Sequence, residues 1–454
     1  MQKEQILSKP IKELAWKLST PGIVGMLMTS VNAIVDAVFA GQFVGSAAMA
    51  GIALSVPLIA FNFAVVRWIG AGSASIVSRA IGAGANEIMG TILYYTIALL
   101  LLFSLFISIA GFFFAEDLIR LMSGDGDVLK YGGQYYLTMS VFSLPSIFGV
   151  GTSVLIRAEG KISYAMKITA VGVILNIIFC TIFSAYFKWG ITGIALSTII
   201  AMSVYSVLTL RYFILRKGML FFGRLPIQPD FKLLKEIVTV GFSGFLSQIS
   251  GLVRQVFPFK VMAINGAETG LVVFSAIYRT FSFSVTPALG MVQALQPVAG
   301  INYGAQFFKR VRSSYFVFLG YGILLMAFIA IMLLAIPGNI LALLIPDVTI
   351  TQTDIFYFRL LISVMFLFPV FPNSITFLQA VGKSKQATMI TFCRDFFLFY
   401  PMLAYCWMWG QAESLYYGIF IENAVCALLF FGYMSIQLQR MKDTHDPIKM
   451  YLVK

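Results

Sequence analysis

A single carboxylate, Asp36, interrupts an apolar stretch at residues 18–44 that is long enough to cross a lipid bilayer. An ionised aspartate in hydrocarbon is costly, so such residues usually face a partner or a water-filled cavity. Asn32 stands one helical turn before Asp36, which places both polar groups on the same face of a helix. A carboxyl group buried away from fixed positive charge can take up and release a proton, so this pair predicts an ion or proton path.

Other apolar stretches also carry charge. Within them or at their margins, six basic residues stand against three acidic ones, namely Arg67, Arg254, Lys260, Arg279, Arg359 and Arg394 against Asp36, Asp395 and Glu422. Arg67 could pair with Asp36, or it could line a cavity with Arg254 and favour anionic or zwitterionic small molecules. Glu422 is either a second ion-binding acid or a packing partner for a neighbouring helix. These alternatives stay open in the sequence.

Several kinds of chemistry find no support. The four cysteines, Cys180, Cys393, Cys406 and Cys426, all fall in apolar stretches, which argues against a disulfide framework or a metal cluster, and the single histidine is His445 in the tail. Gly382-Lys383-Ser384 resembles the end of a phosphate-binding loop, but Phe377 stands where that loop needs glycine. We expect no enzyme activity, no metal and no cofactor.

The elements that must position these residues are membrane-spanning helices. The chain of 454 residues is 59% hydrophobic and only 11% charged, which is far too apolar for a soluble domain of this size. About twelve apolar runs reach spanning length: residues 18–44, 52–81, 91–115, 131–156, 164–187, 191–214, 237–264, 271–299, 315–345, 355–380, 389–409 and 415–436. The predicted fold class is an all-α polytopic membrane protein.

The net charge of +13 reflects topology. In the twelve-span order, 23 of the 32 Lys and Arg residues fall on one side of the membrane. Such an excess marks the cytoplasmic side, so both termini should be cytoplasmic in a multi-pass protein of the plasma (inner) membrane. We expect no nucleic-acid partner.

The chain divides into two halves. A polar linker at residues 216–236 separates a six-helix lobe at 18–215 from another at 237–437, and these are flanked by an amphipathic N-terminus at 1–17 and a tail at 438–454. Short motifs recur about 220 residues apart, such as Ala158-Glu-Gly-Lys161 and Ala380-Val-Gly-Lys383. Six helices separate the copies, so the lobes should be parallel repeats with substrate bound between them. Pro21, ahead of Asp36 on the first span, is the candidate for bending a gating helix.

An ordered set of motifs resembles the multidrug and toxic compound extrusion (MATE) family. The matching features are Pro21 followed by Asn32-Ala-Ile-Val-Asp36, Ser78-Arg79-Ala-Ile-Gly82-Ala-Gly84, Arg157-Ala-Glu-Gly160-Lys161, Asn176 with Gly190-Ile-Thr-Gly193, Gln296-Pro297 with Asn302-Tyr303-Gly304-Ala305, and Gln379-Ala-Val-Gly382-Lys383. The resemblance implies a twelve-helix, two-lobed antiporter, working as a monomer, that exports small organic compounds in exchange for H+ or Na+.

The resemblance also implies a cation site in the N-terminal lobe. Asp36, Asn176 and Thr198 stand at matching places, but Cys180 occupies the position of a second acid. Because thiol sulfur is a poor ligand for Na+, this departure favours H+, with protonation of Asp36 as the coupling switch. The alternatives are a flippase for a lipid-linked glycan and an exporter of anionic amphiphiles.

Overall fold

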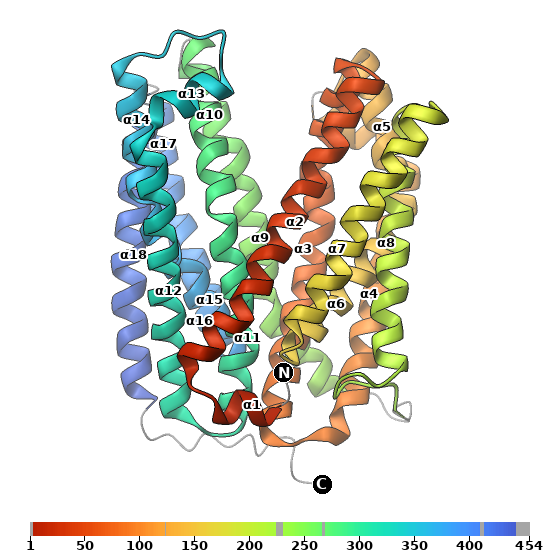
Figure 1. Ribbon diagram of the computed structural model, residues 1–454, viewed down its shortest axis with the longest axis vertical. Coiled ribbons are helices and arrows are strands. Elements are labelled where there is room, and N and C mark those ends of the chain that lie inside the picture. The colour runs from red at the N-terminus through yellow and green to blue at the C-terminus, as the bar shows by residue number, and fades with distance from the viewer. Residues whose placement is uncertain (1–2, 123, 224–229, 266–267, 409–412, 442–454) are drawn as a thin grey trace.

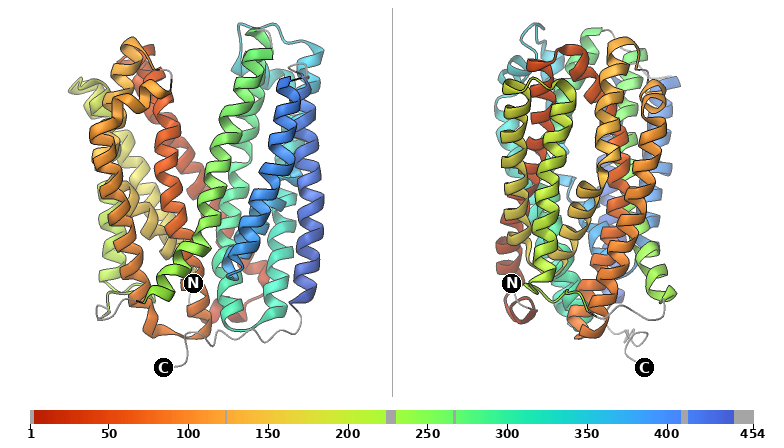
Figure 2. Two further views of the ribbon diagram at one scale, coloured as in Figure 1. Left: turned by 180° about the vertical axis from the view of Figure 1, so that it is seen from behind. Right: turned by 90° about the vertical axis from the view of Figure 1, so that its right-hand side faces the viewer.

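The computed structural model describes residues 3–122, 124–223, 230–265, 268–408 and 413–441. All regular elements in these ranges are helices. Residues 224–229 of the predicted linker and the tail from 442, with His445, lie outside the described residues. The helices form two bundles that meet near the end of the molecule that carries α1 and diverge toward the opposite end (Figures 1 and 2). The predicted all-α, two-lobed fold is confirmed.

The N-terminal lobe follows a short helix α1 (Lys3–Ser8). Its helices are α2 (Ile11–Phe43), α3 (Ser46–Ala83), α4 (Met89–Leu121), α5 (Gly126–Val141), α6 (Ser143–Ala158), α7 (Ile162–Thr181) and α8 (Gly190–Ile214). A π-helical turn at Ile182–Tyr186 extends α7. Helix α2 continues without interruption through Pro21, and bending of the helix at this residue stays a prediction.

The C-terminal lobe repeats this plan with more interruptions. Its helices are α9 (Phe231–Asn265), α10 (Glu268–Ser284), α11 (Thr286–Gly304), α12 (Phe308–Ala335), α13 (Pro337–Leu344), α14 (Gln352–Ser363), α15 (Val370–Ala380), α16 (Ser384–Cys393), α17 (Tyr400–Met408) and α18 (Ser414–Arg440). A π-helical segment, Arg394–Phe399, joins α16 to α17. The tail end of α18 lies at the same end of the molecule as α1 (Figure 1).

The described helices supply the twelve predicted spans, and four of the spans differ from the prediction. The fourth span, expected at 131–156, is the bent pair α5 and α6, which meet at 57°. The ninth, expected to reach residue 345, stops at Ala335, and the tenth is broken between α14 and α15. The eleventh is the run at 384–408, which is less apolar than the others because it contains Lys385, Arg394 and Asp395.

The bend in the fourth span has a local cause. Pro145 has no N–H to donate to the carbonyl of Val141, so the helix opens one turn before the proline. The Ser108 hydroxyl of α4 donates to the carbonyls of Ser140 and Val141 at 3.1 and 3.0 Å. A neighbouring side chain thus satisfies the freed backbone groups, as membrane helices require.

The lobes meet through close helix crossings. Helix α2 packs against α11, and α3 packs against α9. At the first crossing a Cβ on Gly22 would lie 2.4 Å from the Gly290 carbonyl oxygen, and at the second a Cβ on Gly241 would lie 1.7 Å from the Trp68 carbonyl oxygen. Only glycine permits such backbone contact. In each crossing, the first span of one lobe packs against the second span of the other, so the two crossings are equivalent, which fits the parallel repeat that the sequence predicts.

The end that carries α1 is held closed by polar contacts between the lobes. Arg79 of α3 forms an ion pair with Glu236 of α9 at 2.7 Å, and Trp68 Nε1 donates to the Val238 carbonyl at 2.8 Å. Arg310 of α12 donates to the Ile6 carbonyl at 2.9 Å, which ties α1 to the C-terminal lobe. The largest buried apolar cluster lies here and takes side chains from both lobes.

Candidate functional site

The Asp36 carboxyl group lies inside the N-terminal lobe, where α2, α5, α7 and α8 meet. The side chain is 5% exposed. Small and apolar neighbours, including Ala40 of α2 and Ile194 and Ala195 of α8, close the space around it. Small and apolar side chains on the facing sides of four helices therefore let these helices pack closely around one buried carboxylate.

Two hydroxyl groups hold one oxygen of this carboxylate. The Tyr135 hydroxyl donates to Asp36 Oδ2 at 2.8 Å, and the Thr198 hydroxyl donates to the same oxygen at 2.9 Å. Thr198 in turn accepts from Asn176 Nδ2 at 2.8 Å. The result is a connected polar network inside an apolar lobe.

The other oxygen is held more loosely. Asp36 Oδ1 lies 3.5 Å from Asn176 Nδ2 and 3.8 Å from Cys180 Sγ, and Cys180 also contacts Ser197. The Asn176 Oδ1 atom is buried and has no hydrogen-bond partner within the described residues. The loosely held carboxylate oxygen and this amide oxygen are therefore the atoms with lone pairs available to bind a proton or a small cation.

The structure thus brings together four of the five predicted cation-site residues, Asp36, Asn176, Cys180 and Thr198. The fifth, Asn32, lies one turn away and lines the central cavity, and its Oδ1 is also buried without a partner within the described part of the chain. Sequence reasoning missed Tyr135, which comes from α5, 99 residues after Asp36. No spacing or motif distinguishes it from the other 19 tyrosines.

Arg67 does not pair with Asp36. In the described residues, the hydrogen-bonding partners of Asp36 are all uncharged, and none of the ion pairs includes Arg67. Arg67 lies on α3 and lines the same cavity as Arg157. Of the two alternatives for Arg67, the structure therefore supports cavity lining.

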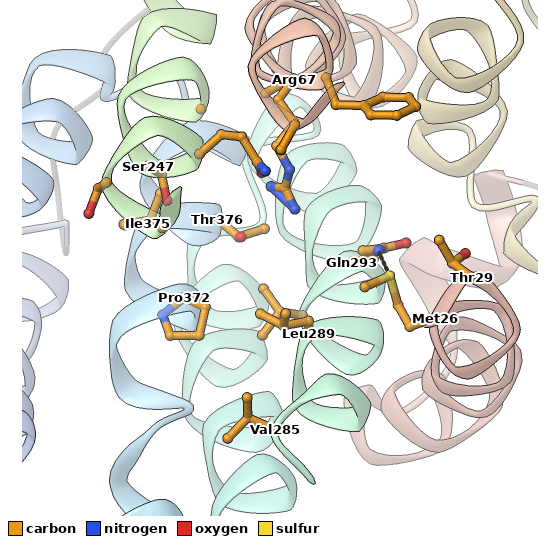
Figure 3. A pocket seen from close by; sticks show the side chains of 18 of the residues that line it. Met26, Thr29, Arg67, Ser247, Val285, Leu289, Gln293, Pro372, Ile375 and Thr376 are labelled. Atoms are coloured by element: carbon orange, nitrogen blue, oxygen red, sulfur yellow. Dashed lines mark hydrogen bonds between the residues drawn. The ribbon is translucent and has the colours of Figure 1, made fainter. Parts of the chain in front are cut away.

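A cavity of about 800 Å³ lies between the lobes. Met26 and Thr29 of α2 and Arg67 of α3 line it from the N-terminal lobe, and Ser247, Gln293 and Thr376 line it from the C-terminal lobe (Figure 3). Gln293 Nε2 contacts Met26 Sδ at 2.9 Å across the lobe boundary, as the dashed line in Figure 3 marks. The cavity has the size and mixed lining of a small-molecule site.

The C-terminal lobe contributes a buried charge cluster to this cavity. Arg254 of α9 binds Asp395 Oδ1 at 3.1 Å and Glu422 Oε1 at 2.8 Å, and Arg394 binds the same Glu422 oxygen at 3.0 Å. Each guanidinium also lies over an aromatic ring, Arg254 over Phe399 and Arg394 over Phe371. Arg254 and Glu422, two of the predicted cavity residues, therefore line the cavity as members of an ion-pair cluster.

Arg157 is one of the 23 basic residues that the sequence places on the cytoplasmic side of the membrane. It lies in the last turn of α6, is half-buried and lines the cavity. Because the arginine side chain has a long apolar stem, its guanidinium can extend from the end of the helix into the cavity. The cavity therefore gains a positive charge that the sequence did not identify.

Comparisons with known proteins agree with this geometry. The family model MatE matches residues 21–182 and 257–405. The multidrug export protein MepA of Staphylococcus saprophyticus is 21% identical over 441 residues, which is 95% of each chain.

Two solved structures have the same fold. A MATE crystal structure in the bent conformation superposes with a TM-score of 0.91, 22% identity and full coverage of both chains. An outward-facing multidrug resistance MATE transporter of the MOP superfamily gives a TM-score of 0.89 with 22% identity, covering 98% of this chain and 99% of the other. The two-lobed helical fold, the membrane spans and the matched residues together lead to one conclusion: the chain belongs to the MatE family, and it is a MATE family transporter.

Proposed function

We propose that this protein is a secondary active antiporter that exports small organic compounds in exchange for inward H+, with protonation of Asp36 as the coupling switch. The observation that carries the proposal is the environment of Asp36, a carboxylate buried in a membrane lobe and held by Tyr135, Thr198 and other uncharged groups. Multidrug export by MepA, a relative along nearly its whole length, supports the substrate class.

The coupling works through two states of the lobe. Ionised Asp36 is stabilised by hydrogen bonds from both the Tyr135 and Thr198 hydroxyls, whereas a protonated carboxyl group can lose one of them. Protonation therefore shifts the equilibrium between two ways of packing α2 against its neighbours α5 and α8. Asn32 carries that shift to the cavity, because it lies one turn from Asp36 on α2 and lines the substrate space. Proton and substrate then favour different states and exchange for each other.

Helix α2 also links the switch to the lobe interface. Pro21 precedes Gly22, the residue at which α2 touches α11 of the other lobe. Proline removes one helical hydrogen bond, so α2 bends more easily there than elsewhere. We place the end that carries α1 in the cytoplasm, where the basic residues concentrate, so the diverging lobes of Figure 1 face outward.

Proton coupling fits the ligands better than sodium coupling does. A second acid would add hard oxygen ligands for Na+, but Cys180 stands at that place and presents sulfur to Asp36 Oδ1. Inward movement of one charge down a membrane potential of 100 mV supplies about 2.3 kcal/mol to drive export. The protein would work in the cell membrane as a monomer, without enzyme activity or a cofactor.

The test is transport in proteoliposomes of a dansyl dye series with one fluorophore and three charges. The series comprises dansylcholine, a permanent cation, dansylglycinamide, which is neutral, and dansylglycine, a carboxylate. An imposed pH gradient should drive at least one dye in the parent protein and none in Asp36→Asn. Transport driven by a Na+ gradient alone would show that sodium is the coupling ion. Failure of every gradient to move any dye would overturn the antiporter proposal.

The sequence left two further functions open, a flippase for a lipid-linked glycan and an exporter of anionic amphiphiles. Both need positive charge in the substrate space, and Arg67 and Arg157 supply it.

A further inference from the structure

The cavity carries more positive than negative charge. Its lining includes four arginines, Arg67, Arg157, Arg254 and Arg394, and one acid, Glu422. Within the described residues, the two arginines of the C-terminal lobe are matched, because Glu422 binds both and Asp395 binds Arg254 as well. The two positive and two negative charges of that cluster cancel. The excess positive charge of the cavity therefore comes from the arginines of the N-terminal lobe.

The N-terminal arginines have no such match. Among the described residues, no ion pair joins Arg67 or Arg157 to an acid, although both line the cavity. Arg67 is exposed even though it sits at the middle of α3, because its side chain reaches into the cavity. In Figure 3 its guanidinium projects into the open centre of the site, at a level between Ser247 and Gln293. An unpaired pair of charges at membrane depth is costly unless something anionic enters.

Other lining groups suit the same kind of occupant. Gln296 Nε2 is a buried donor that has no partner within the described part of the chain. It lines the cavity together with Gln248 and Gln255 and with aromatic rings such as Phe281 and Phe368. Donors around a guanidinium bind oxyanions, and guanidinium matches the two oxygens of a carboxylate or phosphate. Aromatic walls accommodate an apolar body next to that head group.

We propose that the cavity binds organic anions, with Arg67 as the residue that receives a carboxylate or phosphate and Arg157 as the second positive charge that reinforces it. This names a substrate class for the antiporter and so rests on the proposed function. The anion carries an apolar or aromatic body, and it is either free in water or the head group of a lipid. Arg254 stays with its acids and forms the opposite wall.

The anion site can be tested by measuring ligand binding, which needs no ion gradient. The purified protein in detergent is titrated with dansylglycine, dansylglycinamide and dansylcholine, and the dansyl fluorescence gives each Kd. The parent should bind the carboxylate at least tenfold more tightly than the amide or the cation, because a hydrogen bond to a charged group is worth about that factor or more. The preference should weaken at high salt.

Variants locate the site. Arg67→Met and Arg157→Met should each weaken dansylglycine binding about tenfold or more and leave dansylcholine binding no weaker, whereas Arg67→Lys should restore part of the affinity. The matched control is Arg279→Met, because Arg279 lies on α10, is exposed and does not line the cavity. A second arm uses vesicles with N-dansyl phosphatidylethanolamine, whose anion is a lipid phosphate. Arg67-dependent binding in that arm alone would assign the lipid source.

The outcomes separate this inference from the proposed function. Equal binding of all three soluble dyes, or carboxylate binding that survives both arginine variants, combined with no Arg67-dependent lipid binding, would overturn the anion site. The antiporter would still stand if a pH gradient drives dansylcholine. Conversely, Arg67-dependent anion binding in a protein that no gradient drives would keep the anion site and remove the antiporter.

Discussion

Glu159 should make the protein less stable as the pH rises from about 5 to 7. The residue directly follows α6, just outside the span, and is 5% exposed. Its carboxyl group accepts hydrogen bonds from the Tyr212 hydroxyl on α8 and from the Leu220 backbone N–H in the segment after α8. Burial nevertheless dominates and raises the pKa of Glu159 from its ordinary 4.5 to about 7.

The sign and size follow from proton linkage. Between pH 4.5 and 7 the folded protein keeps a proton on Glu159 that the unfolded chain has released, so the free energy of unfolding falls as the pH rises. Each pH unit is worth about 1.4 kcal/mol, so the interval costs about 3 kcal/mol. Above pH 7 both states are ionised and this dependence ends.

The assay is the thermal unfolding midpoint in detergent, measured from pH 5 to 8 for the parent and for Glu159→Gln. Glutamine keeps the shape and the neutral charge of the protonated side chain, so the variant should lose most of the decline between pH 5 and 7. The exposed Glu87→Gln should keep the parent profile. If the Glu159→Gln and parent profiles have the same slope, the reasoning from burial at this position is refuted.

Two more predictions concern buried contacts. Glu422→Gln should lower the free energy of unfolding by about 3–5 kcal/mol, because the two arginines that Glu422 bridges lose a buried negative charge. Glu87→Gln is the control, and an unchanged unfolding midpoint in Glu422→Gln would contradict the prediction. Gly241→Ala should cost about 1–3 kcal/mol through overpacking, because its Cβ would meet the Trp68 carbonyl oxygen. Gly320→Ala, where nothing lies within 4 Å of the added Cβ, should cost nothing, so equal effects of the two alanines on the unfolding midpoint would refute the crossing argument.

The spans and the pairing of the two lobes were accessible from sequence because both depend on local patterns. Long apolar runs specify membrane helices wherever they occur, and a repeat offset of about 220 residues identifies equivalent positions. Asp36 was identifiable because a lone acid in such a run needs a reason. Asn176 and Thr198 came from the resemblance to a family, and the structure places both beside Asp36.

What sequence could not supply depends on how helices face each other. Tyr135 reaches Asp36 because α5 packs against α8, and a tyrosine is unremarkable in a chain with 20 of them. Arg157 looks like an ordinary basic residue at a helix end until the fold turns its side chain into the cavity. The partners of Glu422 lie 28 and 168 residues before it, so no spacing rule connects them.

Protons should enter through Asp36 in exchange for the exported substrate. The most direct measurement loads proteoliposomes with the dye that the parent transports, clamps the membrane potential with potassium and valinomycin, and follows internal pH with trapped pyranine, starting from equal pH on both sides. Dye leaving down its own gradient should acidify the interior in the parent and leave the pH unchanged in Asp36→Asn. Dye efflux from the parent without acidification, or the same acidification in Asp36→Asn, would contradict the account.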